Sequence, residues 1–93
     1  MMTDYIISAE KNGVKAFYGT KDMLIKDLGF KDEKEFEAFL FANRKELAII
    51  VSKTINKELK IIDSMESADF EKLLKLAIDS YNEFILDVKK LIH

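Results

Sequence analysis

The last third of the chain carries the clearest pattern of hydrophobic and polar positions. From Ser67 onward, apolar residues recur every three or four positions, which is the spacing of one stripe on an α-helix. The stripe consists of Phe70, Leu73, Leu74, Ala77, Ile78, Tyr81, Phe84, Ile85, Val88, Leu91 and Ile92. We therefore predict one long helix with Ser67 as its N-cap, with Leu74 and Ile78 near the centre of the buried face, and with Leu76 and Leu86 outside it.

A second long helix is predicted for residues 44 to 63. Its apolar residues form a wide band: Leu47, Ala48, Ile50, Val51, Ile55, Leu59, Ile61 and Ile62. A band wider than the usual stripe indicates contact with more than one neighbour. Glu58 projects within this band. A carboxylate there would have a raised pKa and could act as an acid or base. The alternatives are that it lies at the rim of the band, pairs with a lysine or pairs across an oligomer interface. The short turn over residues 64–66 makes the two long helices antiparallel.

The pattern over residues 4 to 20 predicts a β-hairpin. Asn12-Gly13 between two apolar stretches favours a type I′ turn, because both central positions of that turn need a positive φ. This register places Glu10 opposite Lys15, a favourable cross-strand pair of charges. The face that we expect to be buried carries Tyr5, Ile7, Ala9, Val14, Ala16 and Tyr18.

Two short helices are predicted between the hairpin and the long helices. The first begins after Thr20, a suitable N-cap, and ends at Gly29, which suits the left-handed position after a helix. The second begins at Asp32, with Glu35 at the position that a capping box requires.

The second short helix has an inner stripe of Phe36, Phe39 and Leu40, and Phe41 lies off that stripe. Asn43 followed by Glu46 repeats the capping signature, so we predict a break at Asn43. The alternative is a continuous helix from residue 33 to residue 62. Together these elements predict a single domain over residues 1–93 with an α+β, mostly α, fold: a hairpin, two short helices, then a long antiparallel helical hairpin.

Composition narrows the classes of function. The chain has no cysteine, which removes disulfides and thiolate chemistry. Its net charge is −2 with the two signs interspersed, so charge does not suggest nucleic acid. We find neither an apolar run long enough to span a bilayer nor a signal-peptide pattern, and we expect a soluble cytoplasmic protein.

Residues that could carry catalysis are few. The one histidine, His93, is the last residue, and no nucleotide-binding, P-loop or nucleophile motif is present. Asp63, Glu66 and Asp69 surround a turn and could bind a divalent cation, but we interpret them as capping groups at helix ends. The sequence therefore predicts a non-enzymatic protein without cofactor or metal.

The segment from Thr20 to Leu40 resembles a helix-turn-helix: a capped helix, Leu-Gly, an apolar residue, then a second helix. It differs from that pattern by one extra residue between Gly29 and Phe36. The resemblance implies that the second helix enters the major groove of DNA. The charge of this helix argues against DNA binding. The helix has one lysine and four acidic residues, Asp32, Glu33, Glu35 and Glu37, which the phosphates of DNA would repel.

We therefore expect a small regulatory or inhibitory protein–protein interaction module, with a helix-turn-helix nucleic-acid binder as the alternative. The surplus apolar surface predicts a homodimer, or a foreign protein partner that covers the same patch. The candidate contact residues are Phe41, Ile49, Asp32, Glu33 and Glu37.

Overall fold

The computed structural model describes residues 8–92 and has the predicted architecture of a hairpin followed by four helices. Its elements are β1 (Ser8–Lys11), β2 (Val14–Phe17), α1 (Lys21–Leu28), α2 (Glu33–Ala42), α3 (Arg44–Ser64) and α4 (Phe70–Ile92). The predicted α+β, mostly α, fold class is confirmed.

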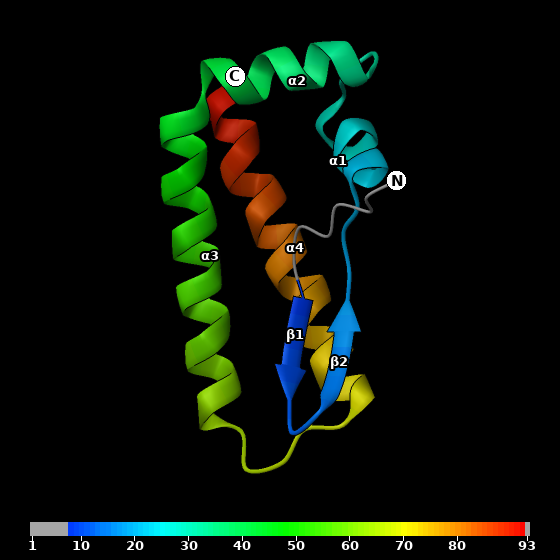
Figure 1. Cartoon of the computed structure of the whole chain (residues 1–93), viewed down its shortest axis with the longest axis vertical. Coiled ribbons are helices and arrows are strands. Elements are labelled where there is room, and N and C mark those ends of the chain that lie inside the picture. The colour runs from blue at the N-terminus through cyan, green and yellow to red at the C-terminus, as the bar shows by residue number, and fades with distance from the viewer. Residues whose placement is uncertain (1–7, 93) are drawn as a thin grey trace.

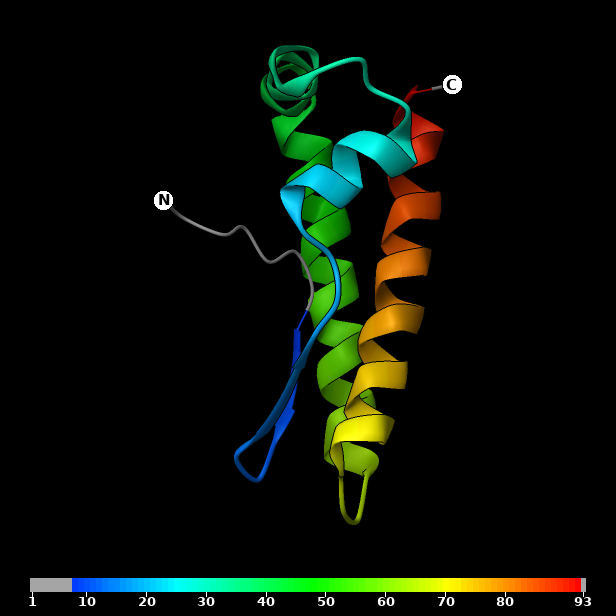
Figure 2. The same ribbon diagram turned by 90° about the vertical axis from the view of Figure 1, so that its right-hand side faces the viewer.

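The long helices α3 and α4 run antiparallel, as the short connection between them requires (Figure 1). The hairpin and α1 lie against one side of this pair, and α2 crosses its end (Figures 1 and 2). Lys57 of α3 donates to both carboxylate oxygens of Glu83 of α4, at 2.7 and 2.9 Å. On the hairpin, Lys11 donates to the carbonyls of Ile62, at 2.9 Å, and Met65, so the hairpin caps the end of α3.

The hairpin has the predicted turn and register. Asn12 and Gly13 have φ angles of 53° and 82°, as a type I′ turn requires. Glu10 pairs with Lys15 and Ala9 with Ala16, and the two alanines are buried. The predicted positions of Tyr5 and Ile7 lie outside the described residues.

The caps of α1 are those that the sequence predicts. The hydroxyl of Thr20 accepts the amide of Met23 at 3.3 Å. Gly29 has a φ of 82°, and the amide of Phe30 donates to the carbonyl of Ile25 at 2.9 Å. This bond and that of the Gly29 amide to Lys26 form a Schellman motif, which satisfies carbonyls that the helix leaves free.

Asp32 caps α2, since its carboxylate accepts the amide of Glu35 at 2.9 Å. In a capping box, the Glu35 carboxylate would accept the amide of Asp32 in return. Here it accepts the amide of Lys31 instead. Phe36 is buried as predicted, whereas Leu40 is exposed, because α2 crosses the end of the α3–α4 pair and buries only a narrow stripe.

The break at Asn43 is confirmed, but its predicted mechanism is wrong. The side chain of Asn43 makes no N-cap bond to α3 and instead donates to the carbonyl of Phe39 in α2, at 3.0 Å. Its own carbonyl accepts the amide of Leu47 in the first turn of α3, at 2.9 Å. Asn43 therefore belongs to the end of α2 and turns the chain by its backbone, at φ −113° and ψ 23°.

Two predictions for α4 are wrong in detail. Asp69, not Ser67, is the N-cap, because its carboxylate accepts the amide of Lys72 at 2.8 Å. Leu76 is buried, whereas Leu74 and Ile78 are only partly buried. The buried face also includes Ser80, and Phe70 at the helix end is exposed. The hairpin packs on the Leu76 side of α4, which shifts the buried face toward it.

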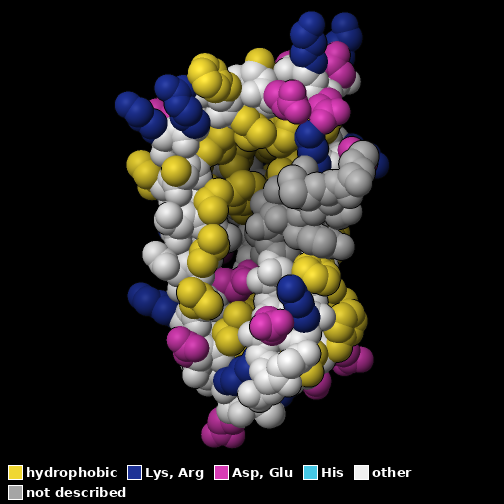
Figure 3. Space-filling view, in the orientation of Figure 1, with side chains coloured by type: hydrophobic (Ala, Val, Ile, Leu, Met, Phe, Trp, Pro, Cys, Tyr) yellow, Lys and Arg dark blue, Asp and Glu magenta, His cyan; other side chains and the backbone are white. Residues whose placement is uncertain are grey.

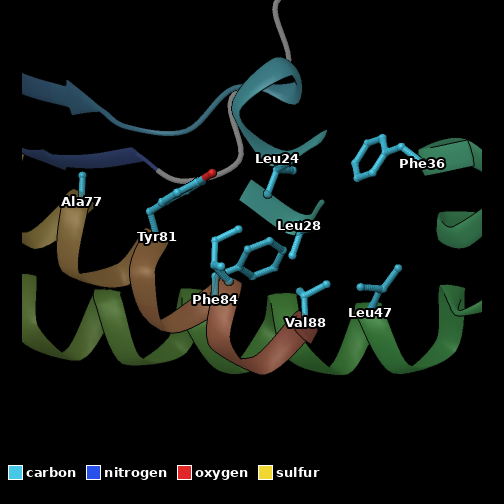
Figure 4. Packing of buried hydrophobic residues seen from close by; sticks show 9 residues of the cluster. Leu24, Leu28, Phe36, Leu47, Ala77, Tyr81, Phe84 and Val88 are labelled. Atoms are coloured by element: carbon cyan, nitrogen blue, oxygen red, sulfur yellow. The ribbon is translucent and has the colours of Figure 1, made fainter. Parts of the chain in front are cut away.

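The larger core cluster joins α1, α2, α3 and α4, with Leu24 and Leu28 of α1 pointing toward Phe84 and Val88 of α4 (Figure 4). Tyr81 anchors α1 to this cluster by donating to the Asp27 carboxylate at 2.6 Å. Burial, and then this carboxylate, raise the pKa of Tyr81 well above its usual value of 10.0. Among the described helices, none is long and apolar enough to cross a membrane.

Candidate functional site

The apolar band of α3 is only partly covered by the rest of the fold. Val51, Ile55 and Leu59 of this band remain 38, 49 and 50% exposed. Figure 3 shows hydrophobic side chains in a column along α3. This face is the surplus surface that the width of the band predicts.

A groove lies between this face of α3, the start of β1 and the middle of α4. Its volume is about 260 Å³. It is lined by Ser8, Val51, Thr54, Ile55, Glu58, Leu59 and Phe84. Val51, Ile55, Leu59 and Phe84 form the hydrophobic part of the walls, Ser8 and Thr54 add hydroxyl groups, and Glu58 is the one titratable side chain among these lining residues.

Glu58 is almost fully removed from water, with 8% of its surface exposed. The Ser80 hydroxyl of α4 hydrogen bonds to its carboxyl group, which favours the charged form. Burial has the larger and opposite effect, so the pKa of Glu58 is raised above its ordinary value of 4.5. The second carboxylate oxygen, Oε2, is buried without a hydrogen-bond partner among residues 8–92.

A buried oxygen without a hydrogen-bond partner has lost its water and gained nothing in return, which lowers the free energy of unfolding by about 1–3 kcal/mol. Glu58 therefore destabilises the fold unless a hydrogen-bond donor reaches it. The hydroxyl side chains of Ser8 and Thr54 also line the groove, and among the described lining residues no histidine, lysine or second carboxylate accompanies them. The groove therefore contains one buried acceptor oxygen that lacks a hydrogen-bond donor among residues 8–92.

The two predicted apolar contact residues are both exposed. Phe41 is 71% exposed, and the guanidinium of Arg44 lies over its ring at 4.6 Å. Ile49 is 70% exposed and lies nine residues before Glu58, which is two and a half helical turns. Ile49 therefore lies on the side of α3 opposite the groove, and the structure does not bring it to Glu58.

The predicted acidic contacts of α2 serve within the fold. Asp32 caps the helix, and Glu33 and Glu37 both pair with Lys21 of α1, the latter at 3.4 Å. These ion pairs connect the start of α1 to the first half of α2, the two short helices that resemble a helix-turn-helix in the sequence. The outer side of α2 remains acidic, and Glu35 adds to it, so we do not propose contact with the phosphates of DNA.

The three carboxylates around the α3–α4 turn lie in different local environments. Asp69 caps α4, while Asp63 and Glu66 are exposed. Within residues 8–92, no group of three or more acidic, histidine or cysteine side chains could hold a metal ion.

Sequence reasoning identified Glu58 and the wide band separately and did not predict that they form one groove. The spacing of Val51, Ile55, Glu58 and Leu59 on one side of the helix was the available signal. The contribution of Ser80 and Phe84 from α4 had no local signal, since it depends on how the helices pack. No protein-family model matches this chain, and searches of curated proteins and of solved structures found no match.

Proposed function

We propose that this protein is a non-enzymatic regulatory module that works by protein contact, and that one partner is a second copy of the chain. The observation that supports this proposal is the half-exposed row of residues along the middle of α3. We define the α3 seam as Ala48, Ser52, Ile55 and Leu59, all of them exposed. Their spacing of four, three and four residues places them on one stripe of the helix, as in a helix–helix interface.

The seam is complementary to itself. In an antiparallel pair of α3 helices, a two-fold axis through the middle of the seam places Ala48 opposite Leu59 of the second copy, and Ser52 opposite Ile55. Each large side chain then meets a small one in four successive layers, so the two helices can approach closely. A two-fold arrangement of this kind is the commonest among soluble oligomers.

The charges beside the seam favour the same antiparallel orientation. Lys45 and Asp63 are eighteen residues apart, which is five helical turns, so they lie on the same flank of α3. The two-fold axis brings Lys45 of each copy near Asp63 of the other. Both residues are exposed, and neither forms an ion pair within residues 8–92. Exposed pairs add little affinity, about 0–1 kcal/mol, but they select the orientation.

Ile49 lies about a quarter turn around α3 from the seam, on the flank of Lys45. It is therefore proposed as a rim contact of the dimer. Phe41, which is exposed at the end of α2, is proposed as a second contact outside the seam. The exposed acidic side of α2 remains available to a foreign partner with a basic surface.

Sedimentation equilibrium at protein concentrations of ~1–100 μM tests the dimer. This range suits the weak association expected of an interface smaller than the standard of about 800 Å² per partner. We expect the wild-type mass to rise from 10.8 kDa toward twice that value. Ser52→Lys should remain monomeric, whereas the matched change Ser67→Lys, at an exposed position outside the seam, should not alter the curve. Lys45→Asp should weaken the dimer, and adding Asp63→Lys should restore it. A wild-type protein that stays monomeric would exclude the second copy and leave a foreign protein as the partner of this face.

A further inference from the structure

We infer that the groove beside α3 binds a lysine side chain of a partner protein, with the ammonium group on Glu58 Oε2 and the aliphatic stem between the apolar walls. The inference rests on the proposed function in one respect, namely that the chain acts by protein contact. It does not require the dimer. Ile55 and Leu59 belong both to the α3 seam and to the walls of the groove, so a second copy and a lysine-bearing partner would compete for this face, and the site is therefore also tested in the Ser52→Lys variant.

Glu58 has a buried carboxylate oxygen that lacks a hydrogen-bond donor within the described part of the chain. One carboxyl group, 8% exposed, has a single hydrogen-bond partner, Ser80, and no described residue donates to Oε2. No lysine or arginine is among the described residues that line the groove. Since a buried charge is normally paired, a cationic donor from outside is the ligand that this site lacks.

The hydrophobic walls of the groove favour a cation that is carried on an aliphatic chain. Val51, Ile55, Leu59 and Phe84 line the groove on the way to Glu58, and three of them are partly exposed at its rim. A bare cation would gain nothing from such walls. An ammonium on a chain of methylene groups would bury its stem against them while its charge reaches the carboxylate.

The single free oxygen of Glu58 distinguishes lysine from arginine. A guanidinium pairs best with a carboxylate by two parallel bonds, one to each oxygen. Here the Ser80 hydroxyl already bonds to the carboxyl group, and only Oε2 is without a partner. A point donor such as an ammonium suits one free oxygen, so the site favours lysine.

The volume of the groove suits a single side chain. Sites for drug-sized molecules and cofactors usually have volumes of about 300–1,000 Å³. The groove, at about 260 Å³, is smaller. It therefore fits one side chain presented by a larger surface better than it fits a free organic ligand, and the exposed apolar residues at the rim would contact the neighbours of that lysine.

Amide chemical shifts measured during titration test the inference, with n-butylammonium as the analogue of the lysine side chain. Dissociation constants of ~1–10 mM are expected for so small a probe. We expect the wild type to bind n-butylammonium at least tenfold more tightly than n-butanol and n-propylguanidinium, with shifts at Val51 and Thr54. Glu58→Gln should lose this preference, and Glu66→Gln, at an exposed acidic position, should keep it. Val51→Phe, which fills the groove without changing its charge, should weaken binding of all three probes.

A second arm identifies the source of the ammonium. A helical peptide with one lysine between leucines should bind at least tenfold more tightly than n-butylammonium, and replacing the lysine by norleucine should remove the gain. The arms are repeated in Ser52→Lys, which the proposed dimer does not tolerate, so that failure of the dimer and failure of the groove are separate results. Equal binding of n-butylammonium and n-butanol, or an unchanged preference in Glu58→Gln, would overturn the lysine site. A peptide no tighter than the free amine would overturn the protein partner.

Discussion

Replacing Glu58 by glutamine should stabilise the isolated protein. The amide keeps the shape of the side chain and its contact with Ser80, and it removes the charge of a residue that is only 8% exposed. A buried polar group without a partner costs about 1–3 kcal/mol. Because the amide also leaves donors unpaired, we expect a gain at the lower end, about 1 kcal/mol at pH 7, or about 4–8 °C in melting temperature.

The gain should depend on pH with a definite sign. Burial raises the folded-state pKa of Glu58 above the ordinary value of 4.5 that applies to the unfolded chain. Below pH 4.5 the carboxyl is protonated in both states, so wild type and variant should differ little. As the pH rises above 4.5, the unfolded state ionises first, and the wild type loses stability until the pH passes the folded-state pKa. The variant lacks this loss.

Urea unfolding of both proteins from pH 4 to pH 8, followed by circular dichroism, measures the difference. Glu66→Gln is the matched control, since Glu66 is exposed in the turn between α3 and α4, and it should show no comparable gain. If Glu58→Gln is less stable than wild type at pH 7, the carboxylate already has a good partner in the isolated protein. Oε2 would then not lack a donor, and the groove would have no need of an external cation.

Three further predictions concern the core, the turn and the anchor of α1. Leu73→Ala should cost about 2–5 kcal/mol in urea unfolding because Leu73 is fully buried, whereas Lys75→Ala should change stability by less than about 0.5 kcal/mol; equal losses would mean that the buried face of α4 is wrong. Gly13→Val should cost about 1–3 kcal/mol through its φ of 82° alone, since an added Cβ meets no atom within 4 Å, and an unchanged melting temperature would refute the type I′ turn. Tyr81→Phe should cost about 1 kcal/mol, because the exposed Asp27 can bond to water instead; a loss above ~3 kcal/mol in thermal unfolding would show that the bond to Asp27 carries more of the packing than we infer.

The sequence alone determined the features whose causes lie within a few residues. Asn12-Gly13 specified the turn and therefore the whole hairpin register, because each strand position follows from the turn. Thr20 and Gly29 specified the ends of α1 in the same way, by hydrogen bonds to atoms of the adjacent helical turn. Periodicity was enough to predict both long helices, and the short turn between them predicted that they are antiparallel.

Local signals failed where one helix boundary offered more than one possible hydrogen bond. Asn43 carried the signature of an N-cap, but its amide bonds backward to α2, because the helix end before it also has free carbonyls. Ser67 and Asp69 were both suitable caps for α4, and Asp69 is the one in use. In both cases the pattern located the boundary to within a few residues and left the atoms that make it undecided.

Only the tertiary structure decided which part of each apolar band is covered. Periodicity gives the direction of a stripe but not the positions of its neighbours, so Leu76 was predicted outside a face that the hairpin in fact extends to cover. The same limit applies to α3, where Ile55 and Leu59 belong to the band and yet remain half exposed. Glu58 was visible in the sequence as a charge among apolar residues. Its burial, its single partner Ser80 and its free oxygen follow from the packing of α3 on α4, because a carboxylate loses its water only when a second element arrives to exclude it.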